Sequence, residues 1–159
     1  MTKEQISSYT MRISQANTVQ LALILYEIII GSVEDALFNF EKNDMDSFEH
    51  DVVQAQNFLQ ELISMSRMDS KTAADTMSIY LFVDHELLMS LVKKQPVNLT
   101  ECLGYLKSLQ KSFVTIAETD TDGPLMENTQ QVYAGLTYGK GYLNESMDPM
   151  GNPNRGFQA

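Results

Sequence analysis

The stretch NTVQLALILYEIIIGSVEDALFNFE, residues 17–41, decides the fold. Its apolar side chains recur every three or four residues, a spacing that predicts one face of an α-helix: Leu23, Tyr26, Ile30, Val33, Leu37 and Phe40. A second such series is Met45, Phe48, Val52, Ala55, Leu59 and Leu62. The third is Met77, Leu81, Asp84, Leu88 and Leu91. The fourth is Leu99, Cys102, Leu106, Leu109, Phe113 and Ile116. Each series predicts a seam that packs against neighbouring helices.

The polar residues that precede these series predict where the helices begin. Three pairs have the spacing of a reciprocal capping box: Asn17 with Gln20, Asp46 with Glu49, and Asn98 with Glu101. The connections between the four helices are short, so neighbours in sequence are expected to be antiparallel. The sequence therefore predicts an all-α fold, an antiparallel up-down four-helix bundle over residues 17–122, preceded by an N-terminal arm over residues 1–16.

Glycine and proline are concentrated after the predicted bundle. Residues 123–159 hold six of the eight glycines and three of the four prolines. This density predicts a flexible Gly/Pro-rich C-terminal tail, in which residues 125–133 could form a short extra helix. Three tyrosines interleaved with glycines leave a second interpretation open, in which the tail occupies an apolar groove: Tyr133, Tyr138 and Tyr142.

Charge and composition exclude several classes of partner. The chain has 159 residues, with 11 basic and 21 acidic side chains, for a net charge of −10. A polyanion would be repelled, so nucleic acid and anionic membranes are poor partners. The longest apolar run, residues 21–30, is too short to insert into a membrane and contains Glu27. A single cysteine and no visible signal peptide favour a reducing compartment, so the cytosol is the expected location.

Two of the predicted helices carry more apolar surface than one seam requires. Opposite the first seam lie Leu21, Ile24, Leu25 and Ile28. Off the third seam lie Ile79, Phe82 and Met89. Two interpretations remain open: the arm and tail complete the core over these faces, or the faces form a groove for a partner helix or extended peptide.

Signals for catalysis or metal binding are weak. His50 and His85 lie in no metal-ligand spacing, and Cys102 occupies a seam position that predicts a buried, unreactive thiol. Residues 118–129 only faintly resemble a calcium loop, with Thr129 where the bidentate glutamate is required. We therefore expect no enzyme activity, no catalytic or metal-ligating residue and no cofactor.

Three segments give the chain a resemblance to a known family. Tyr9 followed by QANTVQLALILYE at residues 15–27, QAQNFLQEL at residues 54–62, and YLFVDHELL at residues 80–88 stand in the order and spacing of the FliS family. These are the flagellin-specific export chaperones of bacterial flagellar type III secretion. The resemblance covers about residues 5–118.

The resemblance implies a non-catalytic chaperone of the bacterial cytosol. Such a protein binds the disordered C-terminal segment of flagellin, prevents premature polymerisation and presents the subunit to the export gate, and its arm occupies a groove until displaced. The candidate partner-binding residues are then Tyr9, Leu21, Ile24, Leu25, Ile28, Phe58, Ile79, Phe82 and Met89. Two alternatives remain: a generic helical-bundle adaptor for an unrelated amphipathic peptide, and a small enzyme or metal protein with an unrecognised site.

Overall fold

The structure is a computed structural model, and it describes residues 3–66 and 71–118 of the chain. These residues form five helices and no strand: α1 (Lys3–Ser14), α2 (Thr18–Glu41), α3 (Met45–Met65), α4 (Lys71–Lys93) and α5 (Leu99–Ala117). The all-α class is thereby confirmed for the described part of the chain. The predictions for residues 119–159, including the three tyrosines and the extra helix, concern residues outside the described part.

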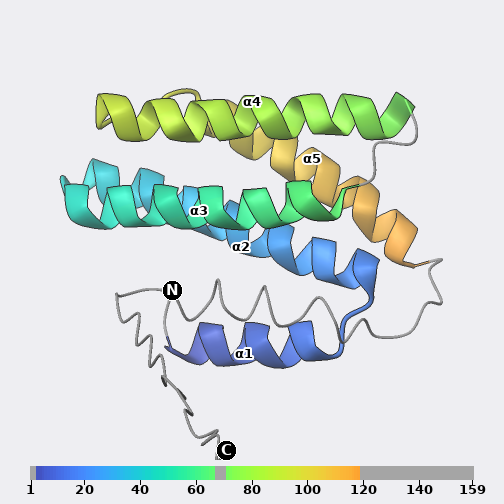
Figure 1. Ribbon diagram of the computed structural model, residues 1–159. Helices are drawn as coiled ribbons and strands as arrows, with labels where there is room; N and C mark the ends of the chain where they lie inside the picture. Colours follow the sequence, from blue (N-terminus) through green and yellow to red (C-terminus); the bar gives the residue numbers. More distant parts are fainter. Residues whose placement is uncertain (1–2, 67–70, 119–159) are drawn as a thin grey trace, which may run out of the picture.

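Helices α2 to α5 pack together, and α1 lies beside α2 (Figure 1). Each helix in this series runs in the direction opposite to the one before it, and α1 likewise runs opposite to α2. Helix α2 contacts α1, α3 and α5, whereas α4 contacts α3 and α5. Helix α2 is therefore surrounded on more sides than the others, which explains why its first half is apolar all round.

The beginning of α2 follows the predicted capping box. The Gln20 backbone N–H donates to Asn17 Oδ1 at 2.8 Å, and the Asn17 backbone N–H donates to Gln20 Oε1 at 3.1 Å. Two backbone N–H groups that the first turn leaves without helical partners are thus satisfied. This prediction is confirmed.

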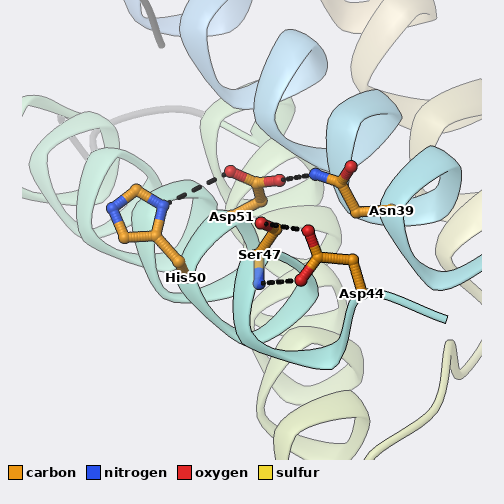
Figure 2. Close-up of polar contacts among 5 residues, drawn as sticks. All are labelled: Asn39, Asp44, Ser47, His50 and Asp51. Atoms are coloured by element: carbon orange, nitrogen blue, oxygen red, sulfur yellow. Dashed lines mark hydrogen bonds and ion pairs between the residues drawn. The ribbon is translucent and has the colours of Figure 1, made fainter. Parts of the chain in front are cut away.

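The other two predicted capping boxes are wrong. The N-cap of α3 is Asp44, two residues before the predicted Asp46. Asp44 accepts hydrogen bonds from the Ser47 backbone N–H at 3.1 Å and from Ser47 Oγ at 2.7 Å (Figure 2). Asn98 does precede α5, but with φ of 51° its side chain makes no cap hydrogen bond. Its Nδ2 donates instead to Glu86 Oε2 at 2.9 Å, which ties the start of α5 to α4.

Most of the predicted seam residues lie in one hydrophobic core. Tyr26 and Val33 of α2, Phe48 and Leu59 of α3, and Leu106 of α5 are completely buried. Cys102 is also buried, as predicted for an unreactive seam position. Figure 2 shows a polar contact at the edge of this core, where Asn39 Nδ2 of α2 donates to the buried Asp51 of α3 at 2.7 Å.

The predicted seam of α4 is wrong by one residue. The apolar residues buried on this helix are Met77, Tyr80, Val83 and Leu87. Leu81 and Leu88, assigned to the seam by their spacing, are 57% and 47% exposed. Both series have helical periodicity, and the Tyr80 series faces the core because the Tyr80 hydroxyl hydrogen-bonds the Tyr26 hydroxyl there. The register of α4 therefore depends on a contact with α2 that periodicity does not contain.

Candidate partner-binding surfaces

The predicted groove face of α2 is part of the core. Leu21, Ile24, Leu25 and Ile28 are each at most 3% exposed, and Phe58 of α3 is 1% exposed. Neighbouring helices cover these residues, so they form no open groove while α1 is in place. Of the two interpretations left open by the sequence, the structure favours the one in which the arm completes the core.

Helix α1 supplies that cover along one side of α2. Ile13 and Ala16 are buried in the core, and Ile6 and Tyr9 pack against it while remaining partly exposed. The predicted candidate Tyr9 is thus a residue of the covering helix and not of the surface that it covers. The cover consists of a short amphipathic helix with few apolar side chains.

An ion pair fixes the position of α1 on α2. The two guanidinium nitrogens of Arg12 donate to the two carboxylate oxygens of Glu27, at 2.6 and 2.9 Å. The Arg12 guanidinium also lies 5.7 Å from the centre of the Tyr9 ring. The hydrogen bonds that Arg12 donates to Glu27 raise the pKa of Arg12, and burial, followed by the nearby Glu27 charge, raises the pKa of Tyr9. Both side chains of the pair are over a third exposed, so its contribution to stability is modest.

Two of the nine predicted residues line an open apolar pocket between α4 and α5. This α4–α5 pocket has a volume of about 270 Å³ and is lined by Ser78, Ile79, Phe82, Glu101 and Tyr105. The Phe82 and Tyr105 rings meet edge to face, with centroids 5.9 Å apart. The Tyr105 hydroxyl donates to Glu101 Oε1 at 2.9 Å and is held there, which raises the pKa of Tyr105. An apolar floor with a polar rim suits one or two side chains of a peptide or helix.

Met89 completes the set on α4. It lies seven residues after Phe82, which places it about 20° away on the same helical face, and its side chain is partly buried. The structure thus brings Ile79, Phe82 and Met89 onto one face of α4, as the sequence predicts, but Met89 does not line the pocket.

A second apolar surface lies on α4 and was missed from the sequence. This α4 outer stripe consists of Leu81, Leu88 and Val92, the last of which is 69% exposed. The spacing of Leu81 and Leu88 predicts that they belong to the buried seam of α4. The sequence therefore shows that these positions form an apolar face, but the face points to solvent and not to the core. Beside the stripe, Asp84 Oδ1 accepts hydrogen bonds from Gln56 Nε2 at 3.1 Å and Gln60 Nε2 at 2.9 Å, which link α3 to α4.

A third hollow, the end cavity, lies where four helices end or begin. It has a volume of about 270 Å³, and its walls come from the start of α2, the end of α3, the start of α4 and the end of α5. The residues that form it include Thr18, Ala22, Met65, Ala73, Tyr80 and Phe113. Sequence reasoning did not find this cavity, because its walls come from four separate segments.

The described residues offer little to a metal ion or a nucleophilic mechanism. No group of three or more His, Cys, Asp or Glu side chains comes together in residues 3–66 and 71–118. His50 and His85 each lie beside a single carboxylate, at 3.4 and 4.0 Å. Burial raises the pKa of Cys102 to about 12, so its thiol stays protonated and unreactive near neutral pH. Within the same residues, no helix has the length and apolar character needed to span a membrane.

An all-helical protein with partly covered apolar surfaces has the geometry of a protein that binds helices or peptides. Comparison with protein families identifies the particular kind. The family described as "Flagellar protein FliS" matches residues 1–120, well over half of the chain, so the protein belongs to the FliS family. The resemblance seen in the sequence is confirmed, and membership implies a chaperone role in flagellar export. Comparison with curated proteins gives no match.

Proposed function

We propose that this protein is a non-catalytic cytosolic chaperone that binds the disordered C-terminal segment of flagellin. It would prevent premature polymerisation and deliver the subunit to the flagellar export gate. In this proposal helices α2 to α5 act as an up-down four-helix bundle, and α1 is its N-terminal arm. Family membership supports the chaperone role, and the surfaces described above support binding of an apolar segment.

The α4–α5 pocket is the observation that carries the proposal. Its floor is made by Ile79 and Phe82, both expected from the sequence to contact a partner, and Tyr105 lies at its edge with 40% of its surface exposed. A client helix that inserted an apolar side chain here would bury surface that now faces water. A disordered client loses conformational entropy when it orders, so a large contact surface gives only moderate affinity.

Helix α1 would provide a second, conditional contact surface. A client helix that displaced α1 would gain access to the side of α2 near Glu27, where Ile24 and Ile28 lie within about 60° and 100° of that residue on the helix. The exchange is energetically plausible because one apolar cover replaces another. A partner in the place of α1 would contact only the surface that α1 now covers, and not the surface covered by α3 or α5. This limit applies to the four candidate residues of α2: Leu21, Ile24, Leu25 and Ile28.

The proposal is tested by calorimetry with the full chain and a synthetic peptide of the flagellin C-terminal segment. The heat capacity should decrease on binding, and this negative ΔCp would report the burial of apolar surface. Tyr105→Ser should weaken binding several-fold because it removes the edge of the α4–α5 pocket. Val114→Ser is the matched control: it is 43% exposed on the same helix, and nine residues, about two and a half turns, place it on the opposite face.

No binding of the peptide at high micromolar concentration, with the protein folded by circular dichroism, would refute the proposal. That result would favour the alternative of a helical-bundle adaptor for an unrelated amphipathic peptide. Equal weakening by Tyr105→Ser and Val114→Ser would retain the flagellin client but remove the pocket from its binding site.

A further inference from the structure

The end cavity lies at the point where the described part of the chain stops. Phe113 and Ile116, in the last turns of α5, form one of its walls, and the description ends two residues later at Glu118. Figure 1 shows the end of α5 at the same end of the molecule as the start of α2 and the end of α3. Forty-one residues, 119–159, follow from this point. The chain that continues from α5 therefore starts at the cavity.

The sequence after α5 places its first apolar side chains within reach of that cavity. Residues 119–124 are Thr, Asp, Thr, Asp, Gly and Pro, and Leu125 and Met126 follow. Acidic residues beyond a helix C-terminus oppose its dipole, and glycine and proline oppose its continuation. Seven residues from Glu118 to Leu125 span at most about 25 Å when extended, more than enough to turn back onto the last turn of α5.

The cavity has a size and lining that suit these side chains. Its volume of about 270 Å³ is just below the lower limit, about 300 Å³, of pockets that hold small organic molecules. It therefore suits one or two side chains better than a whole helix. Its walls are predominantly apolar, with Ala22, Leu62, Met65 and Phe113 among them, so an unfilled cavity would leave this surface to water.

We propose that Leu125 and Met126 of the same chain occupy the end cavity between α2, α3, α4 and α5. The contact is intramolecular, and a tether of seven residues gives these side chains an effective concentration that no free peptide at micromolar concentration matches. Docking there fastens the segment after α5 to the ends of three other helices. It needs no client, so it stands or falls independently of the proposed function.

A tryptophan probe tests this proposal directly, because the chain contains no tryptophan. In the full-length protein, Leu125→Trp should emit at shorter wavelength than Phe157→Trp near the end of the chain, and acrylamide should quench it several-fold less. Ala73→Leu, which fills the cavity, should shift the emission of the Leu125→Trp probe to that of Phe157→Trp. Ala74→Leu is the matched control, since Ala74 is exposed, follows Ala73 directly and does not line the cavity.

A cross-link tests the same contact without filling the cavity. Cysteines introduced by Leu125→Cys and Thr76→Cys, the latter in the cavity wall, should form a disulfide, whereas Phe157→Cys with Thr76→Cys should not. Buried Cys102 stays in place. Three results would overturn the proposal: emission from the Leu125→Trp probe equal to that of Phe157→Trp, emission unaffected by Ala73→Leu, or protection that grows with protein concentration. The last would assign the cavity to a second copy of the chain.

Discussion

Replacing Arg12 by alanine should loosen α1 without unfolding the rest of the protein. Arg12 makes two hydrogen bonds to Glu27, at 2.6 and 2.9 Å, and lies over the Tyr9 ring. Since the paired side chains are 45% and 37% exposed, the ion pair contributes about 0.5 kcal/mol after solvent screening. The cation–π contact at a partly exposed ring adds about 0.5 kcal/mol. Together they come to about 1 kcal/mol, which is a change of about fivefold in the ratio of docked to undocked α1.

Hydrogen exchange of the α1 backbone amides measures that ratio. In Arg12→Ala these amides should exchange about fivefold faster, because exchange follows the free energy of local opening, while amides in the middle of α2 and α3 keep their rates. Met11→Ala is the control, since Met11 is the neighbouring residue, is 66% exposed and makes no ion pair. Raising the salt concentration should speed exchange in the original protein and have little effect in Arg12→Ala.

Two results would refute this account of α1. If α1 exchanges at the same rate in Arg12→Ala and the original protein, the ion pair does not hold the helix. If Met11→Ala accelerates exchange equally, the effect comes from helix composition and not from the contact with α2.

If α1 competes with a client, Arg12→Ala should also tighten client binding. The gain in affinity should not exceed the factor by which the variant raises the population of undocked α1.

Three further predictions concern stability, each measured by urea unfolding. Leu25→Ala and Leu106→Ala should each lower the free energy of unfolding by about 2–5 kcal/mol, because both side chains are completely buried. A small loss for Leu25→Ala would indicate that this side chain lies in an open groove instead. Lys94→Gly should stabilise by about 0.5 kcal/mol, because Lys94 has φ of 52° at the end of α4; a lower midpoint would contradict this. Burial raises the pKa of both Tyr26 and Tyr80. The tyrosines of the unfolded chain therefore ionise first, above about pH 10, so the free energy of unfolding is full below that pH and should fall as the pH rises. Tyr26→Phe should reduce the slope of the free energy of unfolding against pH by about 1.4 kcal/mol per pH unit. An unchanged slope would contradict the burial of Tyr26.

Local pattern predicts helices α2 to α5, whereas α1 lies in the segment expected only to be an arm. The seam of α3 is predictable because this helix has one dominant apolar series, in which Phe48, Val52, Ala55 and Leu59 are all completely buried. The capping box at Asn17 was found because both partners lie within four residues. The same spacing at Asp46 and Asn98 forms no capping box, so local spacing alone does not decide where a helix begins.

The direction of α4 could not be predicted in the same way. Its Leu81 series and its Tyr80 series both have helical spacing, and spacing alone does not choose between them. The structure buries Tyr80 because its hydroxyl finds the Tyr26 hydroxyl, 54 residues away in sequence. A buried tyrosine needs such a partner, so the choice between the two faces is made by a tertiary contact.

The same reasoning explains why the sequence leaves two interpretations open for the apolar face of α2. Periodicity shows that a face is apolar, but it does not show which element covers it or how strongly. Helix α3 covers α2 along an extensive interface, whereas α1 contributes chiefly Ile6, Tyr9 and Ile13 and one partly exposed ion pair.

Because few contacts hold α1 in place, the face of α2 beneath it is buried in this structure but becomes accessible when α1 leaves. A client that buries more apolar surface than α1 does can replace it, while the interface between α2 and α3 stays closed. Among the sequence-predicted residues of α2, those on the Glu27 side are thus the ones that a partner could reach. The side-chain methyl NMR signals of Ile24, which is nearer to Glu27 on the helix, should shift when a client binds, and those of Leu25, about 160° from Glu27, should not.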